Sequence, residues 1–251
     1  MAEPTAHVKE IFSGLQGEGL YVGERQLFVR FEGCNLRCLY CDTPAALTRT
    51  LMARVEEEPG SRKFTELPNP FGVEELLAEI RRMCQRHGLH KHIALTGGEP
   101  FCSQAFLYAL LPELHQRGYK VYLDTNATYG SAAGELAPFV DVYAADLKLF
   151  STSGMPDTLP LHRWFLERVP HDKVFVKLVC TASMDEGEFA DAIALIASLN
   201  PALPLVLQPV SAAEPEVIPT EAQLLRWQGQ ASEFLSTVRV VPQVHVPAGW
   251  K

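Results

Sequence analysis

Short apolar runs alternate with longer amphipathic segments along this chain. Each run holds four to seven residues rich in Val, Leu, Ile and aromatic side chains, which is the length and composition of a buried strand. These runs predict a protein built around a sheet. The predicted strands are residues 26–31, 92–96, 120–126, 140–146, 174–180, 203–208 and 238–241.

Helix-like segments lie between most of the predicted strands. Residues 73–87, 104–117, 185–199 and 220–236 place apolar side chains at the i, i+3, i+4, i+7 spacing of a helix with one buried face. The repeated β-α order predicts a parallel sheet. About six such units, rather than the eight of a closed barrel, predict an α/β fold with an incomplete TIM-like (βα)6 barrel.

Length and composition favour a single domain. A chain of 251 residues is long enough for one sizeable core, and α/β barrels of this length commonly form one domain, so we expect residues 1–251 to fold together. Residues 48–70 are rich in charge and proline and show no periodicity. We interpret them as an insertion that follows a cysteine-rich loop.

The charge balance narrows the class of partner. The formal net charge is -8, whereas nucleic-acid binding depends on clustered Lys and Arg, so we expect a small-molecule substrate and no nucleic acid. No apolar run approaches the ~20 residues that span a bilayer, and no signal peptide is recognised, so we expect no membrane contact and a cytoplasmic location. In that reducing compartment, Cys84, Cys102 and Cys180 have no mutual spacing and are predicted to be packing residues.

Three cysteines lie within eight residues, directly after the first predicted strand. Cys34, Cys38 and Cys41 have x3 and x2 spacing on the loop at the carboxyl end of that strand, where active-site groups of such barrels lie. Three thiolates can hold an iron-sulfur cluster and leave one iron open. A structural zinc site would need a fourth Cys or His close by, and residues 22–33 and 43–51 contain none. A non-catalytic metal-binding module remains an alternative.

The cysteine spacing resembles that of radical S-adenosylmethionine (radical SAM) enzymes, in which three cysteines hold a [4Fe-4S] cluster whose open iron binds SAM. One predicted strand later comes Gly97-Gly98-Glu99-Pro100, which resembles the turn that binds the amino group of SAM in that superfamily. The resemblance implies SAM contacts from Gly98 and Glu99, and an adenine contact from Tyr40. It also implies that the cluster starts radical chemistry with one electron.

A narrower resemblance spans nearly the whole chain. The segments that carry it are Ile11-Phe12-Ser13-Gly14-Leu15-Gln16-Gly17-Glu18-Gly19, Cys41-Asp42-Thr43, Leu207-Gln208-Pro209-Val210 and Arg239-Val240-Val241-Pro242-Gln243-Val244-His245. Together they resemble 7-carboxy-7-deazaguanine synthases, which convert 6-carboxy-5,6,7,8-tetrahydropterin to 7-carboxy-7-deazaguanine with loss of ammonia. That ring contraction feeds preQ0 and queuosine (7-deazapurine) biosynthesis.

This resemblance implies a set of site residues and partners. The implied substrate contacts are Leu15, Gln16, Gly17, Arg30, Thr96 and His245. The implied SAM contacts, besides Tyr40, Gly98 and Glu99, are Asp42, Asp124, Asp146, Lys148 and Gln208. Thr43 is the implied Mg2+ ligand, and no catalytic residue is expected beyond these binding groups. The resemblance also implies a homodimer and reduced flavodoxin, or a similar protein, as electron donor.

Two segments depart from the synthase pattern. Asp146-Leu147-Lys148 replaces a Ser-Pro-Lys segment, and Asp124-Thr125-Asn126-Ala127 replaces a Glu-Thr-Gln-Gly segment. Both variants resemble glycyl-radical activating enzymes, which are therefore the alternative within the radical SAM superfamily. We prefer the synthase, because activating enzymes are not expected to carry Gln16-Gly17-Glu18-Gly19 or the Gln243-x-His245 tail.

Overall fold

Ten strands of the described residues form one continuous sheet, in the order β12-β11-β10-β9-β8-β7-β3-β2-β4-β5. The computed structural model describes residues 3–211 and 214–250. The strands of this sheet are β2 (Val8–Leu15), β3 (Arg25–Phe31), β4 (Met52–Glu56), β5 (Phe64–Pro68), β7 (Ile93–Gly97), β8 (Val121–Thr125), β9 (Val142–Leu147), β10 (Val174–Cys180), β11 (Leu205–Pro209) and β12 (Val238–Val240). The short strands β1 (Thr5–Ala6) and β6 (Phe71–Gly72) pair separately.

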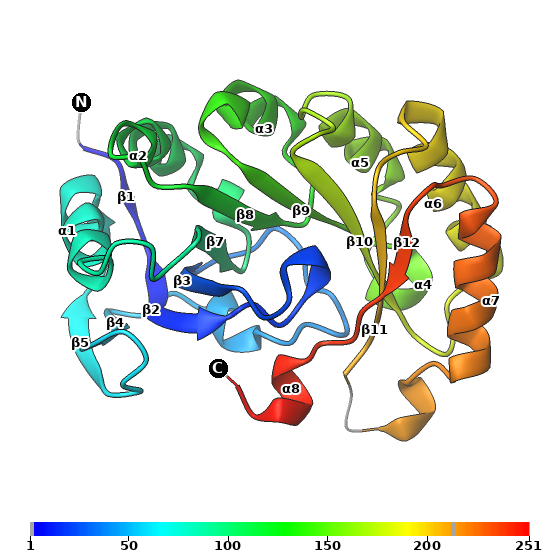
Figure 1. Ribbon diagram of the computed structural model, residues 1–251, viewed down its shortest axis with the longest axis horizontal. Coiled ribbons are helices and arrows are strands. Elements are labelled where there is room, and N and C mark those ends of the chain that lie inside the picture. Colours follow the sequence, from blue (N-terminus) through cyan, green and yellow to red (C-terminus); the bar gives the residue numbers. More distant parts are fainter. Residues whose placement is uncertain (1–2, 212–213, 251) are drawn as a thin grey trace.

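All the longer helices lie along the outer side of the curved sheet and follow its strand order (Figure 1). From β3 to β12 every neighbouring pair of strands is parallel. The α-helices are α1 (Val73–Met83), α2 (Gln104–Gln116), α3 (Gly130–Leu136), α4 (Phe150–Ser153), α5 (Leu159–Leu166), α6 (Glu186–Leu199), α7 (Glu221–Ser232) and α8 (His245–Ala248). The sheet ends in two edges, β12 and β5, so the predicted incomplete barrel is confirmed.

The seven predicted strands and four predicted helices are all present, with differences mainly at their ends. The helix predicted over 73–87 ends at Met83, and Cys84 is its C-cap residue. The helix predicted over 220–236 begins with a capping box at Thr220 and ends at Ser232.

Residues 48–70 contain regular structure that their composition did not predict. They form the hairpin β4-β5, whose first strand pairs with β2 and buries Ala53 and Val55 while Met52 and Arg54 remain exposed. The sequence pattern did not predict this hairpin. One hydrophobic cluster runs from β2 through the hairpin to α7. That residues 1–251 form a single domain, and that residues 48–70 are an insertion in it, stay predictions.

The two faces of the strands have different neighbours. One face packs under the helices in the main hydrophobic cluster. The other face carries a second cluster with side chains from seven adjacent strands: Phe12, Phe28, Ala94, Tyr122, Val142, Ala144, Phe175 and Val206. This inner cluster forms a floor for the loops at the carboxyl ends of the parallel strands. Among the described residues, no helix combines the length and apolar character needed to span a membrane.

Candidate functional site

A cavity of about 450 Å³ lies against the inner cluster, where the loops leaving the parallel strands meet residues 15–18 and the C-terminal segment. It gathers side chains that are distant in the sequence. All but one of the predicted site residues line it: Leu15, Gln16, Gly17, Arg30, Cys34, Cys38, Tyr40, Cys41, Asp42, Thr43, Thr96, Gly98, Asp124, Asp146, Lys148, Gln208 and His245.

Glu99 is the exception, because its carboxylate is fully buried outside the cavity. It accepts hydrogen bonds from the backbone nitrogens of Phe101, at 3.0 Å, and Asn126, at 2.7 Å, and from the Thr125 hydroxyl at 2.9 Å. Burial raises the pKa of Glu99 to about 7, although these hydrogen bonds oppose the shift. In this arrangement Glu99 fastens its turn to the end of β8, and its contact with SAM stays a prediction.

The glycines of the same turn allow an unusually close approach of two backbone segments. Gly97 has φ of 125°, and a Cβ atom there would lie 2.2 Å from the carbonyl oxygen of Phe31. A Cβ atom on Gly98 would lie 2.1 Å from the carbonyl oxygen of Gly33. The turn therefore packs directly against the chain that leads into Cys34, which explains the two glycines without reference to a ligand.

The three cysteines lie on a loop held by backbone hydrogen bonds. Gly33 N donates to Ala46 O at 2.7 Å, and Leu39 N donates to Ser153 O at 2.9 Å. Leu36 N points to the Cys34 sulfur at 3.4 Å. Burial raises the pKa of the Cys34 and Cys38 thiols. All three thiols are unpaired and face one cavity, so the loop fits a cluster with three protein ligands.

Three of the described residues that line the cavity carry buried polar atoms without a partner. Among the described residues, the buried side-chain atoms without a hydrogen bond are Tyr40 Oη, Asp146 Oδ1 and Gln208 Oε1. All three residues line the cavity. An unsatisfied buried polar group costs about 1–3 kcal/mol, which a polar ligand would offset. Acceptors on Asp146 and Gln208 match the hydroxyl and amino donors of SAM, so these residues fit that cofactor.

Lys148 lies between two of these groups. Its ammonium is 2.7 Å from Asp146 Oδ2 and 5.0 Å from the ring centroid of Tyr40. Burial alone would lower the pKa of Lys148, but the Asp146 carboxylate holds it well above its usual value. Lys148 therefore stays charged at this wall of the cavity.

Glu18, Lys177 and Gln243 line the cavity, although none was among the predicted site residues. The Lys177 ammonium is 2.6 Å from Glu18 Oε2. Burial would raise the pKa of Glu18, but the Lys177 charge and hydrogen bond lower it to about 2. Glu18 and Gln243 belong to segments that carry the synthase resemblance. The signal for Lys177 was a lysine inside the apolar run 174–180.

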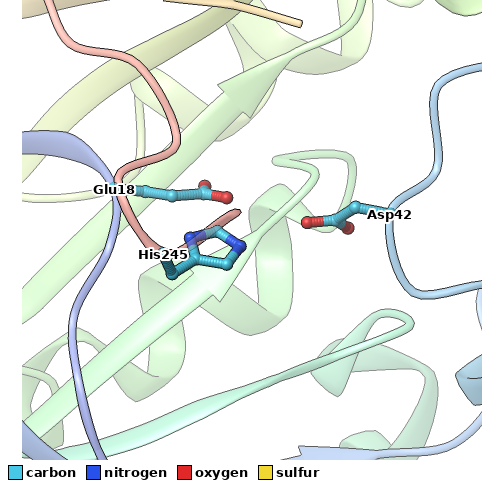
Figure 2. Close-up of side chains that lie close together, drawn as sticks. All are labelled: Glu18, Asp42 and His245. Atoms are coloured by element: carbon cyan, nitrogen blue, oxygen red, sulfur yellow. The ribbon is translucent and has the colours of Figure 1, made fainter. Parts of the chain in front are cut away.

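Glu18, Asp42 and His245 point toward one another from three separate segments (Figure 2). One ligand atom from each lies within 4.8 Å of the others, a spacing that could hold a metal ion. Gln243 Nε2 bridges the two acids, donating to Glu18 Oε1 at 2.7 Å and to Asp42 Oδ2 at 3.0 Å. The C-terminal segment thus joins the loop after Cys41 to the segment after β2.

Gly17 is the position at which the His245 ring packs against the backbone. A Cβ atom on Gly17 would lie 2.4 Å from His245 Nδ1, and Val244 N donates to Gly17 O at 2.9 Å. We therefore expect Gly17→Ala to displace His245 and to raise the KM for the substrate about tenfold, a cost of about 1.4 kcal/mol. Steady-state kinetics will test this, with SAM cleavage in the absence of substrate as the control. An unchanged KM would contradict the role of this contact.

Arg30 lies on β3, and it shares its side of that strand with Phe28, as the alternation of the strand predicted. Its Nε donates to Glu10 Oε1 at 3.0 Å, while the residue lines the cavity. Two other predicted residues are held by neighbours: Thr96 Oγ1 donates to Asp124 Oδ2 at 3.0 Å, and Thr43 Oγ1 lies 3.5 Å from Gly97 O.

An open α/β barrel with three thiols at the carboxyl ends of its strands defines a class of protein, and the Radical SAM superfamily matches residues 28–177. Relatives over the full length narrow that class. The 7-carboxy-7-deazaguanine synthase of Geobacter sulfurreducens is 39% identical over 98% of both chains. That of Methanopyrus kandleri is 35% identical over 96% of this chain and 93% of its own. The chain belongs to the 7-carboxy-7-deazaguanine synthase family of radical SAM enzymes.

The fold agrees with this membership. The crystal structure of QueE from Escherichia coli superposes with a TM-score of 0.64, covering 96% of this chain and 95% of that one, at 22% sequence identity. The family confirms the predicted enzyme and its requirement for a [4Fe-4S] cluster and SAM. It favours the synthase over both the activating enzyme and the non-catalytic module.

Proposed function

We propose that this chain converts 6-carboxy-5,6,7,8-tetrahydropterin to 7-carboxy-7-deazaguanine with loss of ammonia, in the formation of 7-deazapurines such as preQ0 and queuosine. The observation that carries this proposal is the single cavity that combines three thiols, unsatisfied acceptors and Arg30. A carboxylated pterin and SAM need these groups side by side. The cluster and SAM supply one-electron chemistry when bound, which activates an otherwise unreactive carbon-hydrogen bond.

The residues divide the cavity into two halves. On one side, Cys34, Cys38 and Cys41 would hold the cluster, and the acceptors of Asp146 and Gln208 would receive donors of SAM. We name this side the SAM half; it comprises the cysteine loop, Tyr40, Asp124, Asp146, Lys148 and Gln208. The inner cluster keeps water from beneath both ligands.

We name the other side the substrate half. It comprises residues 15–18, Arg30, Thr96, Gln243 and His245. A guanidinium binds a carboxylate through two parallel hydrogen bonds, so Arg30 would orient the substrate by its carboxylate. The backbone and side chains of residues 15–18 would contact the pterin ring.

An anaerobic assay tests the reaction itself. Cluster-loaded protein is mixed with SAM, dithionite and 6-carboxy-5,6,7,8-tetrahydropterin, and the pterin, 7-carboxy-7-deazaguanine and ammonia are quantified. We expect product and ammonia in equal amounts. SAM cleavage without consumption of the pterin would contradict the proposed substrate.

A magnesium ion is proposed at the substrate end of the cysteine loop. The Thr43 hydroxyl is a hard oxygen ligand that lines the cavity next to Asp42. An ion there would neutralise and orient the substrate carboxylate. Glu18, Asp42 and His245 offer a second possible set of ligands close by.

Thr43→Ala is expected to weaken the magnesium dependence of turnover at least fivefold, a loss of about 1 kcal/mol, while the iron content stays unchanged. Turnover is measured against Mg2+ concentration in Thr43→Ala, Asp42→Asn and the parent protein. If Thr43→Ala responds to magnesium as the parent does, Thr43 is not the ligand. Loss of the response in Asp42→Asn alone would place the ion between Glu18, Asp42 and His245.

The partner and assembly predictions belong to the same proposal. We propose a homodimer in the cytoplasm that receives electrons from a reduced flavodoxin or a protein of similar chemistry. Leu39, between the second and third cysteines, is 81% exposed, and such an apolar side chain beside the cluster loop supports an electron donor docking there. Light scattering measures the dimer, and Leu39→Ser tests the docking through the rate of cluster reduction by flavodoxin.

A further inference from the structure

Lys177 is a cation in the middle of an apolar strand. It lies on β10 between Val176 and Leu178, and only 6% of the residue is exposed. Its ammonium lies close to three carboxylates: Glu18 Oε2 at 2.6 Å, Asp146 Oδ2 at 3.4 Å and Asp124 Oδ1 at 3.7 Å. A buried ammonium is retained only where such partners offset the cost of removing it from water.

The three carboxylates belong to different parts of the cavity. Glu18 is in the substrate half, where its other oxygen accepts from Gln243 at 2.7 Å. Asp146 and Asp124 are in the SAM half, at the ends of β9 and β8. Lys177 therefore stands at the boundary between the halves, with one close partner in the substrate half and two in the SAM half.

We propose that Lys177 is a positioning residue that couples the two halves, so that SAM and the carboxylated pterin each bind more tightly when the other is present. The coupling arises because Glu18, Asp124 and Asp146 compete for the same Lys177 ammonium. This inference rests on the proposed function, because the two halves are assigned to these two ligands.

The direction of the coupling follows from the contacts of Asp146. Its Oδ2 is shared by Lys148, at 2.7 Å, and Lys177, while its Oδ1 has no hydrogen bond. A SAM hydroxyl that donates to Oδ1 supplies Asp146 with a partner and reduces its attraction for Lys177. The ammonium then stays with Glu18 and fixes that carboxylate in the wall of the substrate half. A wall residue that is already fixed loses less conformational freedom when the pterin binds.

Binding measurements on cluster-loaded protein without reductant test the coupling, because SAM is not cleaved under these conditions. The dissociation constant of the pterin is measured with and without saturating SAM. The value without SAM divided by the value with SAM is the ratio that reports the coupling. We expect SAM to lower the dissociation constant of the pterin at least about fivefold in the parent protein, which is the lower range of measured couplings. Linkage requires the pterin to lower the dissociation constant of SAM by the same factor.

Lys177→Met and Lys148→Met form a matched pair, because each removes one buried ammonium beside Asp146. The Lys148 ammonium pairs with Asp146 and lies over the Tyr40 ring, so its removal should weaken SAM binding and leave the ratio of pterin dissociation constants near the parent value. Lys177→Met should bring the ratio to about one, and Lys177→Arg should restore part of it. A Lys177→Met protein with the parent ratio would overturn the proposal.

Glu18→Gln provides a second test that keeps the lysine, in case Lys177→Met does not fold. It replaces the charged acceptor at 2.6 Å with a neutral one of similar shape, so we expect the ratio to fall to about one. A retained ratio in Glu18→Gln would overturn the coupling. If the parent protein binds the pterin and SAM does not change the dissociation constant, the coupling alone is wrong. If the parent protein binds no pterin, the proposed function is wrong as well.

Discussion

Alanine at Cys34, Cys38 or Cys41 is expected to abolish both the iron-sulfur chromophore and SAM cleavage. The three thiols lie on one loop and line one cavity, so each variant would leave two protein ligands for a cluster that needs three. Anaerobic reconstitution followed by iron and sulfide analysis, visible absorption and a SAM-cleavage assay measures the loss. Full activity in any one of the three variants would show that its thiol is not a ligand.

Cys102 provides the control for this experiment. Its exposed thiol is near enough to Cys34 for the charge of one to raise the pKa of the other, and it lies 3.5 Å from Tyr129 Oη. We expect Cys102→Ala to keep the cluster and the cleavage of SAM. If it loses the cluster, Cys102 is needed to hold it, and the assignment of Cys34, Cys38 and Cys41 as its three protein ligands is wrong.

The sequence predicted those elements whose pattern is independent of distant contacts. Residues 174–180 were predicted as a strand and form β10 with the same bounds, because a parallel strand covered on both faces is mostly apolar, and here only Lys177 interrupts the run. The amphipathic helix beginning at Val73 was equally visible, since five of its apolar side chains are buried on one face.

Elements whose partners lie far away in the sequence were harder to predict. The strand β2, Val8–Leu15, contains Lys9, Glu10 and Ser13 among its apolar residues. Their partners explain why these are accommodated: Lys9 pairs with Glu32, Glu10 pairs with Arg30, and Ser13 Oγ accepts from Arg25 Nε at 2.9 Å. The hairpin β4-β5 was missed because β5 is an edge strand with little apolar surface to bury.

The candidate site shows the same limit. Motif residues such as Tyr40, Asp146 and Gln208 were predicted from local sequence, and all three line the cavity. Lys177 was missed because its importance depends on carboxylates contributed by three other elements, a fact that spacing along one strand does not contain. Glu99 was predicted to contact SAM, which stays a prediction, and only the folded chain shows that nearby backbone nitrogens donate to its carboxylate.

Arg30→Ala is expected to reduce kcat/KM for the pterin steeply. Loss of an arginine from a desolvated carboxylate pair costs about 2–5 kcal/mol, and much of that cost comes from leaving the partner charge unpaired. Arg30 lines the substrate half with a side chain only 19% exposed. Arg30→Lys should recover only part of the loss, because an ammonium lacks the planar pair of donors. Steady-state kinetics with the carboxylated pterin measures both variants.

The ion pair between Arg30 and Glu10, 3.0 Å apart, means that Arg30→Ala changes two things at once. Glu10→Gln separates them, since it removes the charge of the partner and keeps the guanidinium. If Arg30 binds the substrate carboxylate, Glu10→Gln should lose much less kcat/KM than Arg30→Ala, and cleavage of SAM without pterin should be nearly unchanged in every variant. If SAM cleavage falls in parallel with pterin turnover, Arg30 supports the cysteine loop that follows β3, and the substrate-binding role is wrong.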